Sequence, residues 1–159
     1  MGLDILFYKR RLTAENENLE PNEVRQKCWE DYNETGDESI PNEDEVCGLE
    51  LLKAYRKYNF LMSFFNYQDR CVEYDDFYGD ATYIKIEKYE INEFINEAKR
   101  ILQVRDTKDN RFKPVAGLFF GSQETDGNYF KAIQECKNDF QTWMDEADDN
   151  TEFYMFASW

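Results

Sequence analysis

The stretch LDILFYKR at residues 3–10 has the clearest strand pattern near the start of the sequence, and it is decisive for the fold. Leu3, Ile5 and Phe7 occupy every second position, which is the two-residue period of a β-strand. The intervening positions hold Asp4 and further apolar side chains, so both faces of this strand are partly apolar. We therefore predict a first strand over residues 3–10.

Four segments show the three-to-four-residue spacing of apolar side chains that is typical of a helix. The clearest is residues 49–65, whose apolar stripe consists of Leu51, Leu52, Tyr55, Tyr58, Met62 and Phe65. A short helix is predicted to open at Pro21, and a second major helix ends near Val104. The last helix is predicted to begin at Asp126 or Asn128, either of which can cap it.

Two more segments are predicted as strands, and a third as a strand or a buried loop. The strands are residues 83–88 and 152–159, and the ambiguous run is residues 115–120. In the closing strand, Phe153, Met155, Ala157 and Trp159 are expected to point inward. The predicted strands lie too far apart in sequence for hairpins, so helices connect them. We predict a single α+β domain over residues 1–159, with a small antiparallel or mixed sheet of three to four strands covered by three to four helices.

Charge is distributed unevenly along the chain. The whole sequence carries 34 acidic and 19 basic residues, a net charge of −15, and residues 12–50 alone carry 13 acidic and two basic residues, a net charge of −11. We call residues 12–50 the acidic segment and interpret it as an insertion after the first strand. An acidic surface repels phosphate, so we expect no direct DNA or RNA binding. We expect either a partner with a basic surface or a charge that serves only solubility.

The acidic segment contains the candidate partner-binding residues. Its carboxylates suit a basic surface, and its two large aromatic side chains suit the role of anchors. The candidates are Trp29, Glu30, Asp31, Tyr32, Glu34, Asp37, Glu38, Glu43, Asp44 and Glu45.

Other chemistries find little support in the sequence. There is no histidine, which excludes nucleophiles activated by histidine, and the four cysteines, Cys28, Cys47, Cys71 and Cys136, are too scattered to predict a zinc site. The acidic clusters lack the order of a calcium loop, and no pair of carboxylates stands out as acid and base. We expect no catalytic residue, metal or cofactor, and a carboxylate- or metal-dependent enzyme ranks last. No apolar run is long enough for a membrane span, so we expect a cytoplasmic protein.

Four stretches together resemble a family of uncharacterised phage and prophage proteins. They are MGLD at residues 1–4, YRKYN at 55–59, GLFFGS at 117–122 and ASW at 157–159. The family opens with M-G-L-D, carries W-R-K-x-N and G-F-F-F-G-S motifs, and often ends in an aromatic strand. This chain departs from the family pattern in having Tyr55 in place of tryptophan.

The resemblance implies a phage origin and a small accessory role in the host cytoplasm. Accessory phage proteins often inhibit host defence, so we expect the partner to be a host protein with a basic surface, such as a CRISPR effector or another defence nuclease. The alternative is a small-molecule-binding protein that sequesters a nucleotide signal (a sponge). The resemblance implies that its small-molecule pocket would be lined by Arg56, Asn59, Ser122, Asp126 and Tyr129.

Overall fold

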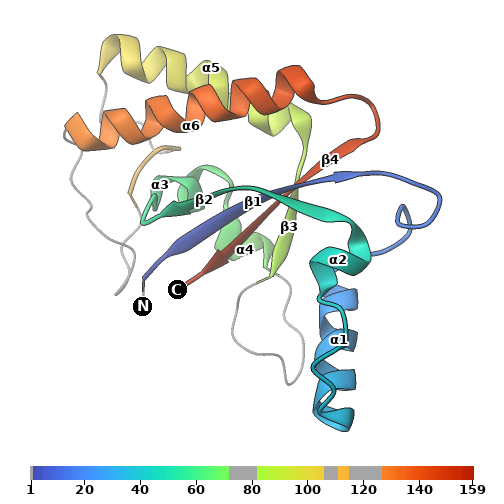
Figure 1. The fold of residues 1–159 in the computed structure, drawn as a ribbon. Coiled ribbons are helices and arrows are strands. Elements are labelled where there is room, and N and C mark those ends of the chain that lie inside the picture. Colours follow the sequence, from blue (N-terminus) through green and yellow to red (C-terminus); the bar gives the residue numbers. More distant parts are fainter. Residues whose placement is uncertain (1, 72–81, 106–110, 115–126) are drawn as a thin grey trace.

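A computed structural model describes residues 2–71, 82–105, 111–114 and 127–159. In chain order the elements are β1 (Asp4–Arg11), α1 (Pro21–Thr35), α2 (Glu43–Cys47), β2 (Leu49–Arg56), α3 (Phe60–Phe64), α4 (Tyr67–Arg70), β3 (Tyr83–Ile86), α5 (Lys88–Val104), α6 (Gly127–Glu146) and β4 (Thr151–Ser158). The strands form one antiparallel sheet in the order β2-β1-β4-β3 (Figure 1). The predicted α+β class is confirmed, and the described residues hold six helices, more than predicted.

The first and last strands of the chain lie side by side in the middle of the sheet. Asp4 pairs with Ser158 at one end of the β1–β4 ladder, and Arg11 pairs with Thr151 at the other. The strands predicted at residues 3–10 and 152–159 are therefore confirmed, as is the shorter edge strand β3. The run predicted at residues 115–120 lies outside the described residues.

One face of the sheet carries the main hydrophobic core. Helices α5 and α6 lie next to each other over this face (Figure 1). Phe94 of α5 and Phe140 of α6 are fully buried, and their ring centroids are 4.7 Å apart. Phe7 of β1 meets Phe140 at 5.1 Å, which joins the sheet to the helices. The two long helices predicted after residue 90 are confirmed.

The opposite face of the sheet is covered by the acidic segment. A second, smaller cluster forms there from buried residues of the strands and of α2, namely Tyr8, Cys47, Leu49, Tyr83 and Tyr154, with Leu19 and Val24 of the acidic segment packed against it. The alternation in β4 directs Phe153, Met155 and Ala157 into the main core as predicted. Trp159 does not follow the pattern, because it lies beyond the last strand residue and is 39% exposed.

The helix predicted over residues 49–65 is wrong. Residues 49–56 form edge strand β2, and only the short helix α3 follows. The register passes from Phe7–Lys53 to Tyr8–Leu51, so Leu52 is an extra residue in a β-bulge. The bulge places Leu52 and Tyr55 in the main core and Leu49 on the opposite face. The spacing of three residues between Leu52 and Tyr55 imitates a helical period in the sequence.

Candidate functional site

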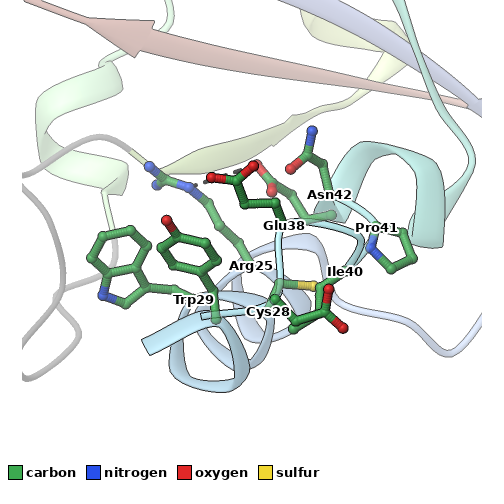
Figure 2. Close-up of a pocket in the computed structure, with 10 residues that line it drawn as sticks. Arg25, Cys28, Trp29, Glu38, Ile40, Pro41 and Asn42 are labelled. Carbon is green, nitrogen blue, oxygen red and sulfur yellow. Dashed lines mark ion pairs between the residues drawn. The ribbon is translucent and has the colours of Figure 1, made fainter. Parts of the chain in front are cut away.

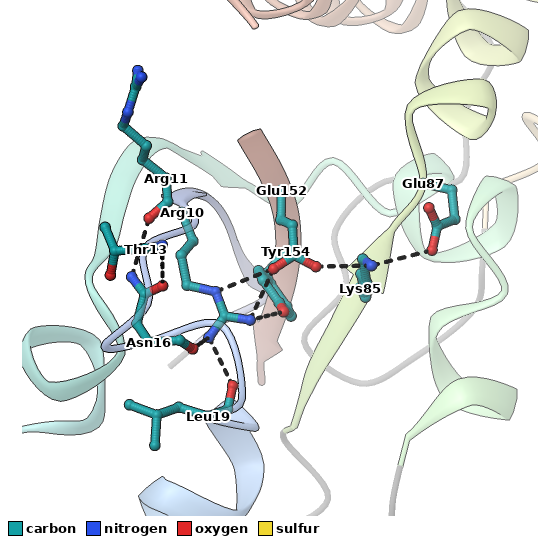
Figure 3. Close-up of polar contacts among 9 residues, drawn as sticks. All are labelled: Arg10, Arg11, Thr13, Asn16, Leu19, Lys85, Glu87, Glu152 and Tyr154. Carbon is teal, nitrogen blue, oxygen red and sulfur yellow. Dashed lines mark hydrogen bonds and ion pairs between the residues drawn. The ribbon is translucent and has the colours of Figure 1, made fainter. Parts of the chain in front are cut away.

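The acidic segment is fixed to the sheet by a buried arginine. Arg10 at the end of β1 is 3% exposed. Its Nη1 donates to the backbone oxygens of Asn16 at 3.1 Å and Leu19 at 2.7 Å. Its Nη2 donates to the Tyr154 hydroxyl at 2.8 Å and to the Glu152 carboxylate at 2.9 Å (Figure 3). One side chain therefore joins the first turn of the acidic segment to the central strands.

Glu152 balances the positive charge of Arg10. Its other carboxylate oxygen lies 2.8 Å from Nζ of Lys85 on β3 (Figure 3). Burial by itself would raise the pKa of Glu152, but hydrogen bonds from Lys85 and Arg10 outweigh that effect and hold the pKa below its usual value. The carboxylate is therefore ionised at neutral pH, and the buried guanidinium keeps its partner.

A second attachment joins α1 to the edge of the sheet. Asn22, at the start of α1, is 4% exposed. Its Nδ2 donates to the backbone oxygen of Tyr83 at 2.8 Å, and its Oδ1 accepts from the Tyr83 backbone N–H at 2.7 Å. The amide thus occupies the free edge of β3 as a neighbouring strand would.

The residues at its two ends explain why α1 starts and ends where it does. The Glu20 carboxylate accepts from the Glu23 backbone N–H at 2.9 Å and caps α1, and Pro21 has the fixed φ that suits a first helical position. Gly36 ends the helix with a φ of 64°. Between these ends α1 projects away from the sheet, and the chain returns alongside it to α2 (Figure 1).

A cavity of about 630 Å³ lies between α1 and the returning chain. Cys28, Trp29 and Tyr32 line it from the α1 side. The loop contributes the apolar residues Ile40 and Pro41 and the carboxylates of Asp37 and Glu38, and α2 contributes Glu43 (Figure 2). The Trp29 and Tyr32 rings are stacked, with centroids 6.1 Å apart and planes 30° apart.

The structure places all ten predicted partner-binding residues on α1, α2 and the loop between them. Six of them are exposed to solvent, namely Glu30, Tyr32, Glu34, Asp37, Glu38 and Glu45, and the other four, Trp29, Asp31, Glu43 and Asp44, are half-buried. Glu43 has partners within the protein: its Oε1 accepts from the Tyr83 hydroxyl at 2.9 Å and lies 3.6 Å from Nε of Arg25. Of the exposed carboxylates, those of Asp37 and Glu38 line the cavity, and Glu43 both lines it and holds α2 against the sheet.

Two groups in the cavity are not available for chemistry at neutral pH. Burial raises the pKa of the Cys28 thiol, and the nearby carboxylates of Glu43 and Asp31 raise it further, so the thiol stays protonated. The Arg25 guanidinium is paired with Glu43 and lies over the Phe156 ring, 4.8 Å from its centroid. The described lining of the cavity therefore offers no thiolate nucleophile at neutral pH.

Three residues of the alternative small-molecule pocket, Arg56, Asn59 and Tyr129, are described, and none of them lines this cavity. Arg56 ends β2 instead of lying within a helix, and its side chain is 60% exposed and 3.5 Å from Asp4. Asn59 is buried at the start of α3. The Tyr129 hydroxyl donates to the Phe112 backbone oxygen at 2.7 Å. The other two predicted residues, Ser122 and Asp126, lie outside the described residues.

A polar network that the sequence did not reveal links β2 to α6. Nζ of Lys53 lies 2.6 Å from Glu135 and 2.8 Å from Asp139, and the Tyr55 hydroxyl donates to Asp139 at 2.7 Å. Burial would lower the pKa of Lys53, but the bonds to Asp139 and Glu135 outweigh it and raise the pKa. The pKa of Glu135 is lowered by hydrogen bonds from Lys53 and Tyr58. A proton donor or acceptor works best with a pKa near neutrality, so these shifts favour a structural clamp.

No group of three or more histidine, cysteine, aspartate or glutamate side chains in the described part of the chain could hold a metal ion. The four cysteines form no disulfide. No helix among the described residues is long and apolar enough to cross a membrane.

Comparison with protein-family models, with curated proteins and with solved structures gives no significant match to this chain. The resemblance to phage proteins therefore stays a prediction.

Proposed function

We propose that this protein is a phage-encoded, non-enzymatic inhibitor that binds a host defence protein through the acidic segment. The target class is a nuclease with a basic nucleic-acid channel, such as a CRISPR effector, in the host cytoplasm. One observation carries the proposal: the carboxylates of Glu30, Glu34, Asp37, Glu38 and Glu45 are exposed on a segment that buried side chains fix to the sheet.

Fixed placement matters for the strength of binding. A flexible acidic tail loses conformational freedom when it binds, and that loss opposes association. Here Arg10 and Asn22 already hold the segment before a partner arrives. The net charge of −11 over residues 12–50 would speed the encounter with a basic channel and discriminate against acidic partners.

The test is a charge reversal that leaves the cavity intact. The variant carries Glu30→Lys, Glu34→Lys and Glu45→Lys, and its matched control carries Asp69→Lys, Glu146→Lys and Asp149→Lys, three exposed acids outside the acidic segment. Each variant changes the net charge from −15 to −9. Tagged proteins are used to capture partners from a lysate of the host bacterium at low and high salt, followed by mass spectrometry.

We expect the wild type and the control to retain a basic nuclease at low salt and to release it at high salt, and the acidic-segment variant to retain none. The nuclease so identified is then assayed for cleavage, which the wild type should inhibit. Equal retention by both variants would show that the location of the charge is irrelevant. A retained nuclease whose cleavage is unaffected would contradict the inhibitor role.

A further inference from the structure

The cavity beside α1 has two walls of different chemistry. The stacked rings of Trp29 and Tyr32 form an aromatic platform on one side. Ile40 and Pro41 add apolar surface on the loop side (Figure 2). A volume of about 630 Å³ lies within the range of pockets that hold small ligands and leaves ample room for one side chain. An occupant of this cavity therefore has to offer a flat or apolar surface to the rings.

The charge of the cavity restricts the occupant further. Three carboxylates line it, from Asp37, Glu38 and Glu43, against one guanidinium, from Arg25. Arg25 is paired with Glu43. Within the described residues, neither Asp37 nor Glu38 has a basic side chain as its partner, which leaves two negative charges in the lining uncompensated. Anions are repelled, and a cation is favoured.

We infer that this cavity receives an arginine side chain from a basic segment of the partner protein, an inference that rests on the proposed function. A guanidinium is planar and stacks on aromatic faces, and its five N–H groups pair with carboxylates. The Trp29 and Tyr32 rings supply the first kind of contact and Glu38 supplies the second. A lysine ammonium is a compact, strongly hydrated charge and uses the aromatic platform less well.

The probe is a tri-arginine peptide with blocked ends, titrated into ¹⁵N-labelled full-length protein. The observed signal is the indole N–H resonance of Trp29, assigned by its loss in Trp29→Leu. We expect this resonance to shift with the peptide while those of Trp143 and Trp159 stay in place. Tri-lysine should bind severalfold more weakly, because it gains charge attraction without stacking. Free arginine, which offers the same guanidinium without neighbouring charges, should shift the same resonance only at much higher concentration.

Matched variants distinguish binding in the cavity from attraction by the net negative charge of the protein. Removing the platform with Tyr32→Ala should weaken tri-arginine binding about tenfold. The control Tyr89→Ala removes a 63% exposed ring that lies outside the cavity, and it should have no effect. Glu38→Gln should weaken binding severalfold, whereas Glu17→Gln, which removes the same charge elsewhere in the acidic segment, should change the affinity by less than about twofold.

The outcomes are distinguishable from those of the capture experiment. If tri-arginine binds equally well to wild type, Tyr32→Ala and Glu38→Gln, or no better than tri-lysine, the cavity inference is wrong while the acidic segment can still bind its partner. No shift of the Trp29 resonance with any peptide also overturns the inference, and partner capture by wild type then stands independently. If no peptide shifts the Trp29 resonance and the wild type captures no nuclease, both the inference and the proposed function are wrong.

Discussion

The two faces of the sheet are covered in different ways. On one face, α5 and α6 bury a large cluster in which Phe7 and Phe94 both contact Phe140. On the other face, the apolar cluster is small, and Arg10 and Asn22 supply directed hydrogen bonds to the acidic segment. The first layer is held mainly by packing and the second mainly by a few polar contacts. A highly charged segment can be attached to a stable domain in this way without its carboxylates entering the core.

The largest loss of stability should come from a mutation in the main core, on the face covered by α5 and α6. Phe140→Ala removes a fully buried ring and should lower the free energy of unfolding by about 4 kcal/mol. Urea unfolding monitored by circular dichroism measures the change. A loss below about 1 kcal/mol would mean that the main core does not dominate stability.

A mutation on the face that the acidic segment covers should destabilise that segment and leave α5 and α6 unaffected. Arg10→Met leaves the backbone oxygens of Asn16 and Leu19 without their buried donor and should cost about 3 kcal/mol. Hydrogen exchange should show that α1 loses protection while α5 and α6 keep theirs. The neighbouring Arg11→Met is the control: this side chain is 74% exposed and 3.3 Å from Asp148, so its loss should cost less than about 1 kcal/mol. Equal loss of protection in all helices would show that the two layers unfold as one unit.

A smaller loss is expected at the edge of the sheet. Asn22→Ala removes both hydrogen bonds to the Tyr83 backbone and should lower the free energy of unfolding by about 2 kcal/mol. The exchange rate of the Tyr83 amide should rise in this variant. An unchanged rate would indicate that α1 does not depend on Asn22 for its attachment to β3.

The smallest effect concerns pH. The pKa of Glu152 is lowered in the folded state, so its ionised form contributes stability above the unfolded pKa, which is about 4.3. That contribution is lost as the pH falls through the lower folded pKa. The difference in stability between the wild type and Glu152→Gln should therefore be constant from pH 7 to about pH 5 and should shrink below it. Taking the difference cancels the general effect of neutralising the other acids. A difference that does not depend on pH would contradict this role for the carboxylate.

The sequence predicted much of the fold because its strongest patterns are local. The stripe that includes Ile133, Cys136 and Phe140 identified α6, and the alternation in residues 152–159 identified β4. Strand β2 was mistaken for a helix because the bulge at Leu52 breaks the two-residue period. No periodic pattern within one segment can show a bulge that is defined by the partner strand.

The candidate site was predicted only in outline. Composition identified the acidic segment, and Trp29 and Tyr32 were expected to act as anchors. The attachment through Arg10 was not foreseen, because its partner Glu152 is 142 residues away in sequence. The clamp of Lys53 with Glu135 and Asp139 was missed for the same reason. Such pairings depend on the three-dimensional path of the chain, so the spacing of residues within one segment cannot reveal them.

The pairing of β1 with β4 also has a consequence for how the chain folds. These two strands form the centre of the sheet, and Asp4 is opposite Ser158. On the ribosome, β1 emerges before β4 and cannot take its place in the ladder until residues 151–158 have been synthesised. Contacts between such distant parts of a chain form slowly, because a long loop must close first. The acidic segment, which depends on Arg10 and Glu152 for its attachment, therefore reaches its final position only after β4 has been synthesised.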